Sequence, residues 1–128
     1  MNRAADWLKQ AERDLGFAET AMATRYYEWA AFCAQQSAAR AVAALIQSLH
    51  GAVRGHSITE MLRELPASVE VPKSALGGAE ELDRVYESSR YPDAFTSGAP
   101  ADHFSEEAGR ELVEYARIIL EFCRSQIP

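Results

Sequence analysis

Arg90 is the residue whose type and position most clearly indicate binding chemistry. It ends a predicted helix beside an exposed loop, and its planar guanidinium can donate paired hydrogen bonds to a phosphate. Because arginine stays protonated, it would act by electrostatic stabilisation rather than as a general base. Tyr91 could stack on a nucleobase, or it could be packed before Pro92. Arg90 could alternatively pair with Asp93 and only hold this corner of the chain.

Two histidines could supply acid–base chemistry. His56 lies between Gly55 and the start of a predicted helix, where a neutral imidazole could contact phosphate or transfer a proton. It could equally bond backbone groups at the turn. His103 follows Asp102 in a long loop that could fold back to Arg90, the alternative being a solvated loop histidine. Catalysis would require an imidazole within hydrogen-bond reach of the reacting group.

Two glutamines lie within the apolar stretch 29–49, which is rich in Ala and contains no Gly or Pro. Two rows of that stretch recur at helical spacing, namely Trp29, Phe32, Gln36, Ala39, Ala43 and Ile46, and Ala38, Val42, Leu45 and Leu49. So wide an apolar face predicts a central helix. Because buried amides must be hydrogen-bonded, we expect one of Gln35 and Gln36 to face water and the other to bond a neighbouring helix. The candidate ligand contacts are Arg90, Tyr91, His56 and Gln36.

Helical periodicity and turn residues predict the remaining elements. We expect helices over residues 4–23, 29–49 and 74–89, a short helix opened by Ser57 and ended by Pro66, and a last helix capped by Ser105, with a loop over 93–104. Their expected buried residues are Trp7, Ala11, Leu15, Ala18, Met22, Ile58, Met61, Leu62, Leu65, Leu76, Ala79, Leu82, Val85, Tyr86, Ala108, Leu112, Tyr115, Ile119 and Phe122. Since no strand pattern occurs, we predict an all-α, up-and-down bundle of about five helices, one of them short.

The composition is that of one globular domain over residues 1–128, with 48% hydrophobic and 25% charged residues. The net charge of -6 argues against broad, sequence-independent nucleic-acid binding, which relies on basic residues neutralising phosphates, but is compatible with a small basic site. The acidic cluster of Glu80, Glu81, Asp83 and Glu87 has no metal-ligand context and is most simply a solvated helix face. We therefore expect neither a metal nor a cofactor.

The two cysteines, Cys33 and Cys123, have no metal-binding or redox spacing and are predicted to be free, mostly buried thiols in a reducing compartment. Acidic residues near the N-terminus argue against a signal peptide. No apolar run approaches the roughly 18 residues that a membrane span needs. Together these features predict a cytoplasmic protein.

Several landmarks occur in a fixed order along the chain. They are Trp7 with Asp14 and Leu15, Ala31 and Phe32 with Gln35, Gln36, Ser37 and Ala38, Gly55, His56 and Ser57 with Leu62, Leu82 and Asp83 with Tyr86, and Arg90, Tyr91, Pro92 and Asp93. In this ordered set the chain resembles the HEPN domain (higher eukaryotes and prokaryotes nucleotide-binding) over essentially its whole length. The resemblance implies a helical bundle that dimerises and binds a nucleotide or RNA. It also implies partnership with a minimal nucleotidyltransferase as a toxin–antitoxin pair.

The resemblance leaves two other functions open. Some family members are metal-independent ribonucleases whose arginine is followed, after four to six residues, by a histidine. Here Arg90 matches that arginine, but the next histidine is His103, so a ribonuclease would need Arg90 with His103 or His56. Ala39 and Arg40 stand where many members carry Glu-Lys. The third alternative is a helical adaptor without catalysis.

Overall fold

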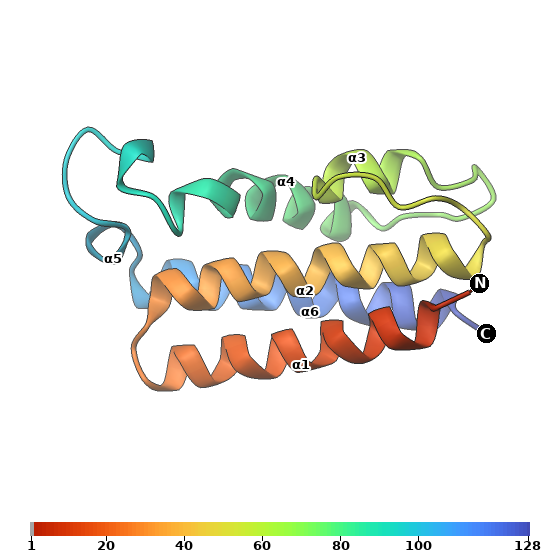
Figure 1. Ribbon diagram of the computed structural model, residues 1–128, viewed down its shortest axis with the longest axis horizontal. Coiled ribbons are helices and arrows are strands. Elements are labelled where there is room, and N and C mark those ends of the chain that lie inside the picture. The colour runs from red at the N-terminus through yellow and green to blue at the C-terminus, as the bar shows by residue number, and fades with distance from the viewer. Residues whose placement is uncertain (1) are drawn as a thin grey trace.

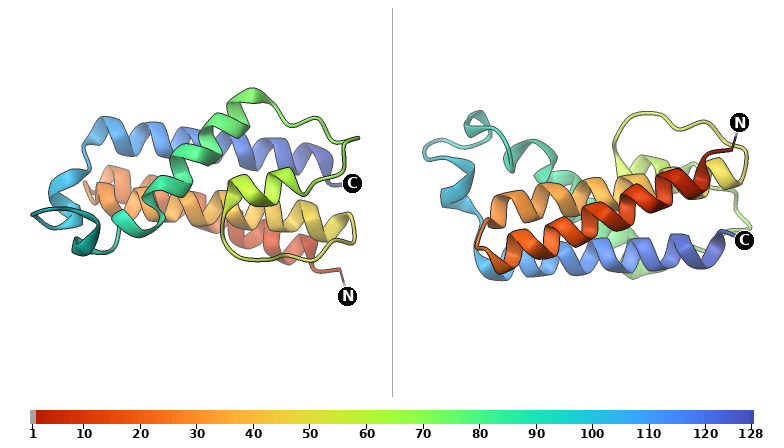
Figure 2. Two further views of the ribbon diagram at one scale, coloured as in Figure 1. Left: turned by 90° about the horizontal axis from the view of Figure 1, so that it is seen from above. Right: turned by 60° about the horizontal axis from the view of Figure 1, so that its bottom comes forward.

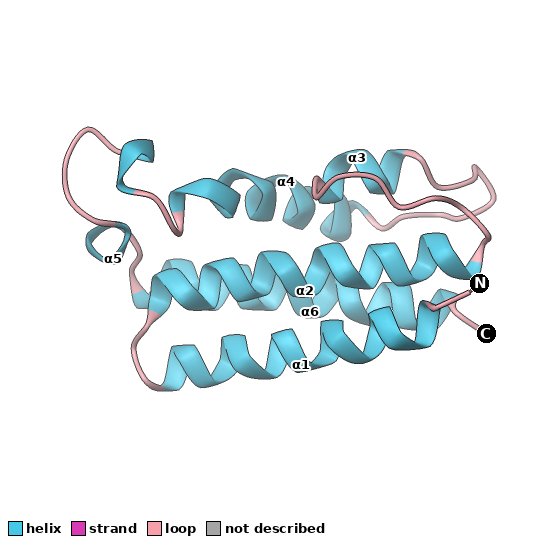
Figure 3. Ribbon diagram, viewed as in Figure 1, coloured by secondary structure: helices cyan, strands magenta, loops and turns pink. Residues whose placement is uncertain are grey.

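The protein is all-helical. A computed structural model describes residues 2–128, and within these residues it contains six α-helices, one 3₁₀ turn and no strand. The elements are α1 (Ala4–Ala23), α2 (Tyr27–Ser48), α3 (Ile58–Arg63), α4 (Lys73–Ser88), η1 (Pro92–Ala94), α5 (Pro100–His103) and α6 (Glu106–Gln126). The predicted fold class is confirmed, and Figure 3 shows how loops join the helices.

Three long helices form the body of the bundle. α1 and α2 are antiparallel neighbours, and α6 packs against both of them (Figure 1). α4 packs on α2 and α6 with α3 beside it, and the view from above shows α4 crossing the bundle obliquely (Figure 2). The link between α1 and α2 is only residues 24–26, which forces the two helices to lie side by side. None of the helices within residues 2–128 is long and apolar enough to cross a membrane.

α2 is the central helix, as predicted, because it contacts α1, α3, α4 and α6. Its buried residues are Ala30, Ala31, Ala34, Gln35, Ser37, Ala38, Ala39, Ala41, Val42, Ala43, Ala44, Leu45 and Ile46. The many alanines allow neighbouring backbones to approach closely, and the Ser37 hydroxyl donates a buried hydrogen bond of 2.8 Å to the Ala11 carbonyl of α1. That bond satisfies a hydroxyl that would otherwise be costly to bury.

The ends of α2 differ from the prediction. The helix begins at Tyr27, two residues before the predicted start, and ends at Ser48. Trp29 and Leu49, which were expected to be buried, are 49% and 40% exposed. Trp29 borders an open groove between α1 and α2, and Leu49 lies just beyond the last helical turn. Periodicity correctly predicted the apolar face, but not how far the neighbouring helices cover it.

α4 buries a different stripe from the predicted one. It begins at Lys73 and buries Ala75, Gly78, Ala79 and Leu82, whereas Leu76 is exposed and Val85 and Tyr86 are half-buried. The cause is Gly78, which has no side chain and therefore allows Tyr115 of α6 to approach the α4 backbone. Trp7, Met22, Leu65, Ala108, Tyr115 and Phe122 are likewise half-buried rather than buried.

The segment 93–104, predicted to be a loop, contains the end of η1 and the single turn of α5. Pro92 and Pro100 occupy the first positions of these two turns, where the fixed φ of proline suits a helix start. The Asp102 carboxylate accepts a hydrogen bond of 2.9 Å from the Ala99 backbone N–H. Helix starts predicted at Ser57 and Ser105 are confirmed, since both hydroxyls accept a backbone N–H.

Candidate functional site

Arg90 lies just after α4 with its guanidinium packed against aromatic rings. The guanidinium carbon is 4.5 Å from the ring centre of Phe32, 4.6 Å from that of Tyr86 and 4.8 Å from that of Tyr91. Arg90 Nε also donates a hydrogen bond of 3.1 Å to the Tyr86 carbonyl. The rings come from α2, α4 and the corner after α4, so tertiary packing brings them together. Each such contact favours the charged guanidinium by roughly 0.5–1 kcal/mol.

Within residues 2–128, Arg90 has no carboxylate partner. The ion pairs of this part of the chain use the arginines Arg3, Arg40, Arg84, Arg110, Arg117 and Arg124. The alternative in which Arg90 pairs with Asp93 is therefore wrong, because no oxygen of Asp93 lies within ion-pair distance of it. Arg90 Nη1 donates a long hydrogen bond of 3.4 Å to the Tyr91 hydroxyl. Because aromatic faces attract the cation without using its N–H groups, the remaining N–H groups of the guanidinium are available to an anion.

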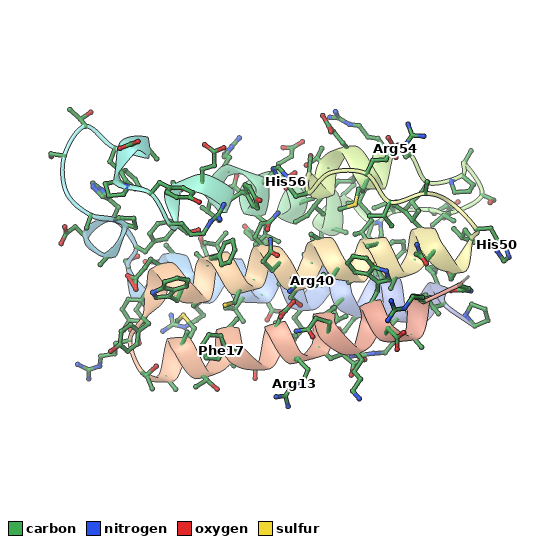
Figure 4. All side chains as sticks on the ribbon, viewed as in Figure 1. Arg13, Phe17, Arg40, His50, Arg54 and His56 are labelled. Atoms are coloured by element: carbon green, nitrogen blue, oxygen red, sulfur yellow. The ribbon has the colours of Figure 1, made fainter. Side chains whose placement is uncertain are left out.

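His56 joins this arrangement from the loop between α2 and α3. Its ring stacks on Tyr86 with centres 3.8 Å apart and planes 15° from parallel. Gly55, with φ of 69°, supplies the left-handed backbone that turns the chain before it. Figure 4 shows His56 above α2 and beside α4. We call His56, Phe32, Tyr86, Arg90 and Tyr91 the Arg90 cluster.

The two glutamines of α2 hold the loop that carries His56. Gln35 is fully buried and its side-chain amide donates a hydrogen bond of 3.0 Å to the His56 carbonyl. Gln36 is half-buried and donates a hydrogen bond of 2.8 Å to the Gln35 amide oxygen. Neither bonds a neighbouring helix, so that expectation is wrong: the partner is a loop carbonyl. A ligand contact by Gln36 stays a prediction.

His103 does not join the Arg90 cluster. Its ring stacks on Phe95 with centres 3.8 Å apart, and its Nε2 lies 2.7 Å from the Ser97 carbonyl oxygen. Both partners belong to the same segment that carries His103, which explains why the loop folds on itself rather than back to Arg90. Of the two candidate histidines, only His56 stacks on Tyr86, the ring that also contacts Arg90.

Asp83 is the residue whose role the sequence did not reveal. Its carboxylate accepts hydrogen bonds from the Ile58 N–H at 3.0 Å, the Thr59 N–H at 2.9 Å and the Ser57 hydroxyl at 3.2 Å. It thus caps α3 from α4, and the interpretation of Asp83 as part of a solvated acidic face is wrong. A cavity of about 280 Å³ adjoins this contact, lined by His56, Ser57, Asp83, Arg84, Tyr86 and Glu87.

Arg40 and the two cysteines offer no free charge to a ligand. Arg40 pairs with Asp14 of α1, so its charge is compensated, whereas that of Arg90 is not compensated by any of residues 2–128. Burial, with Asp14 nearby, raises the pKa of the Cys33 thiol to about 11, an effect that Arg40 opposes. Burial alone raises the pKa of Cys123 to about 12. Both cysteines are free, as predicted, and their thiols stay protonated and unreactive at neutral pH.

Known proteins match the chain over nearly its whole length. The HEPN domain family matches residues 4–126. The crystal structure of TT1696 from Thermus thermophilus superposes with a TM-score of 0.96 at 38% identity, covering 98% of this chain and 99% of that one. ST0689, an archaeal HEPN homologue, has a TM-score of 0.85 at 41% identity and covers 100% of both chains.

A third solved structure, an HEPN domain protein (TM0613) from Thermotoga maritima, has a TM-score of 0.77 at 32% identity. It covers 94% of this chain and 95% of its own. Among curated proteins, none matches this chain significantly. The family match spans nearly all of the sequence, and the ordered landmarks from Trp7 to Asp93 lie within it. The chain therefore belongs to the HEPN domain family.

Proposed function

We propose that this protein binds a nucleotide or an RNA segment at the Arg90 cluster, without robust catalysis. One observation carries the proposal: a guanidinium held against three aromatic rings, with no carboxylate partner among the described residues. A nucleotide has two groups that fit such a site, a phosphate and a base. Its phosphate accepts hydrogen bonds from the remaining N–H groups of Arg90, and its base offers a flat face to Tyr91, which is 51% exposed.

Replacing Arg90 with alanine should weaken the binding of adenosine and uridine 5′-monophosphates by about tenfold or more. The reason is the loss of a charged hydrogen-bond donor, which contributes roughly 1.5–3 kcal/mol. Isothermal titration calorimetry measures the dissociation constants. Arg124→Ala is the matched control, because it removes the same charge from the exposed last turn of α6, outside the Arg90 cluster and the cavity beside it. Arg90→Lys should recover only part of the affinity, since lysine lacks the planar fork.

Two results would contradict the proposal. If Arg90→Ala binds both nucleotides as tightly as Arg124→Ala and the unmodified protein do, the Arg90 cluster is not a nucleotide site. If Arg90→Ala fails to fold, as judged by circular dichroism, Arg90 ties the corner together structurally. We expect folding to survive, because the lost contacts with the rings are worth far less than the stability of a typical domain.

A ribonuclease that uses Arg90 with His56 is the second candidate, and the shared contact with Tyr86 is the observation that favours it. His103 is the weaker choice because its contacts lie within its own segment. The chain lacks a histidine at the family's spacing after Arg90, so we expect metal-free protein to leave single-stranded RNA intact. Cleavage that disappears in both Arg90→Ala and His56→Ala would establish the enzyme instead.

Family membership supports two proposals about partners. A minimal nucleotidyltransferase would act with this chain as a toxin–antitoxin pair, and two copies of the chain would form a homodimer. A helical adaptor that binds only protein is the alternative. The aromatic setting of the Arg90 guanidinium argues against it, because a pure adaptor needs no anion site.

Sedimentation equilibrium at micromolar concentration should report twice the 14.2 kDa mass of one chain. The physical reason is that Leu49 and Leu76 are 40% and 36% exposed, and a two-fold partner would cover such apolar side chains. A mass of one chain throughout the concentration range would contradict the homodimer. Leu49→Ala with Leu76→Ala should then shift the equilibrium towards the monomer.

A further inference from the structure

An open groove lies between α1 and α2, beside the Arg90 cluster. It has a volume of about 480 Å³ and is lined by Phe17, Thr20, Ala21, Thr24, Tyr26 and Trp29. Its three aromatic side chains are unusually exposed for their size, at 57% for Phe17, 59% for Tyr26 and 49% for Trp29. Figure 4 shows Phe17 on α1 in the half of the bundle where α1 joins α2. We call this feature the aromatic groove.

The aromatic groove meets the Arg90 cluster at a single ring contact. Trp29 meets Phe32 edge to face, with centres 6.3 Å apart and planes at 80°. Phe32 in turn lies under the guanidinium of Arg90. The turn between α1 and α2 and the end of α4 lie at the same end of the bundle (Figure 1). Phe32 is therefore the one ring that contacts both Trp29 of the groove and Arg90 of the cluster.

The residue types in the groove favour unpaired bases as the occupant. Within residues 2–128, four of the exposed large hydrophobic side chains are aromatic, and these four, Phe17, Tyr26, Trp29 and Tyr91, all lie in the groove or the cluster. Aromatic faces stack on any base, and each stack contributes roughly 1–3 kcal/mol.

We propose that the aromatic groove holds bases of a single-stranded nucleic acid whose neighbouring nucleotide occupies the Arg90 cluster. This inference rests on the proposed function and narrows it: the ligand is an oligonucleotide strand rather than a mononucleotide. Stacking supplies most of the affinity, because only two cations lie in these segments: Arg90 in the cluster, and Arg25 in the turn between the groove residues Thr24 and Tyr26. The affinity should therefore depend only weakly on salt, as expected for about two phosphate contacts, which is consistent with the net charge of -6.

Trp29→Ala tests the inference when the protein is titrated with uridine 5′-monophosphate and with an octamer of uridylate. We expect the octamer to bind the unmodified protein at least tenfold more tightly than the monophosphate. In Trp29→Ala, the affinity for the monophosphate should be unchanged and the affinity for the octamer should fall about tenfold. The larger number of binding registers on a longer ligand cannot explain this fall, because both proteins are titrated with the same octamer. Trp7→Ala, which removes the other tryptophan of the sequence from a position outside the groove, is the matched control.

Trp29 also reports directly on the groove. In a Trp7→Phe background it is the only tryptophan of the sequence, and the octamer should quench its fluorescence. Tyr26→Ala, at a position 59% exposed and outside the helices, provides a second variant whose folding is not at risk. It should weaken octamer binding in the same direction as Trp29→Ala.

Three outcomes overturn the inference in distinguishable ways. If the monophosphate and the octamer bind with equal affinity, and Trp29→Ala changes neither affinity, the groove is not a binding site but the proposed function at the Arg90 cluster stands. If the protein binds neither the monophosphate nor the octamer, both the proposed function and the role of the groove are wrong. A fall in sedimentation mass in Trp29→Ala, with octamer affinity unchanged, shows that the groove is covered by a second copy of the chain instead.

Discussion

Replacing Asp83 with alanine should lower the free energy of unfolding by about 2–4 kcal/mol, the larger of the two stability changes expected here. The carboxylate accepts the backbone N–H groups of Ile58 and Thr59 and the hydroxyl of Ser57. Its loss leaves these donors at the start of α3 without their partner and frees the segment that carries His56. Urea denaturation followed by circular dichroism measures the change.

Two further variants isolate the capping role of Asp83. Glu80→Ala removes the same charge from an exposed position one turn earlier in α4 and should change stability by less than about 0.5 kcal/mol. Asp83→Asn keeps one accepting oxygen and should fall between the two. If Asp83→Ala is as stable as Glu80→Ala, the hydrogen bonds to α3 contribute nothing and the proposed cap is wrong.

Gly78→Val should destabilise the protein by about 1–3 kcal/mol, whereas the neighbouring Gly77→Ala should stabilise it by up to about 1 kcal/mol. A Cβ at Gly78 would lie 3.0 Å from the Tyr115 Cβ, an atom close to the α6 backbone that cannot swing aside. A Cβ at Gly77 would meet nothing within 4 Å, so alanine there only improves helix propensity. Thermal and urea unfolding of both variants provide the measurement.

The opposite signs make this pair of substitutions its own control, because the two glycines are adjacent in one helix. Gly78→Ala should be milder than Gly78→Val, since a single methyl group demands a smaller shift of α6. A stabilising effect of Gly78→Val would mean that α4 and α6 do not cross closely at Tyr115. The stripe of α4 that faces the core would then be the one predicted from periodicity, with Leu76 buried.

Local signals predicted most of the helices. The span of α1 matches the predicted 4–23, and the hydroxyls of Ser57 and Ser105 begin the helices that they were expected to begin. The central position of α2 followed from the width of its apolar face. These features depend on residues within a few positions of each other, so the sequence contains all the information that they require.

The family was also identified from the sequence, because the order of short landmarks along the chain can be read without knowing what those residues contact. The match over residues 4–126 confirms it. The candidate residues Arg90, Tyr91 and His56 were identified from their types and their places at helix ends. Their surroundings were not, and the alternative pairing of Arg90 with Asp93 was wrong.

Tertiary structure alone decided what the candidate residues contact. Gln35 and the His56 carbonyl are 21 residues apart, and Asp83 and the Ser57 hydroxyl are 26 apart. Arg90 meets Phe32 only because α4 crosses α2. The sequence by itself determined most of the helices, the caps at Ser57 and Ser105, and the family, since each rests on local periodicity or on residue order. The Arg90 cluster and the aromatic groove arise where helices distant in sequence pack together, and the crossing of those helices depends on side-chain packing along their whole length.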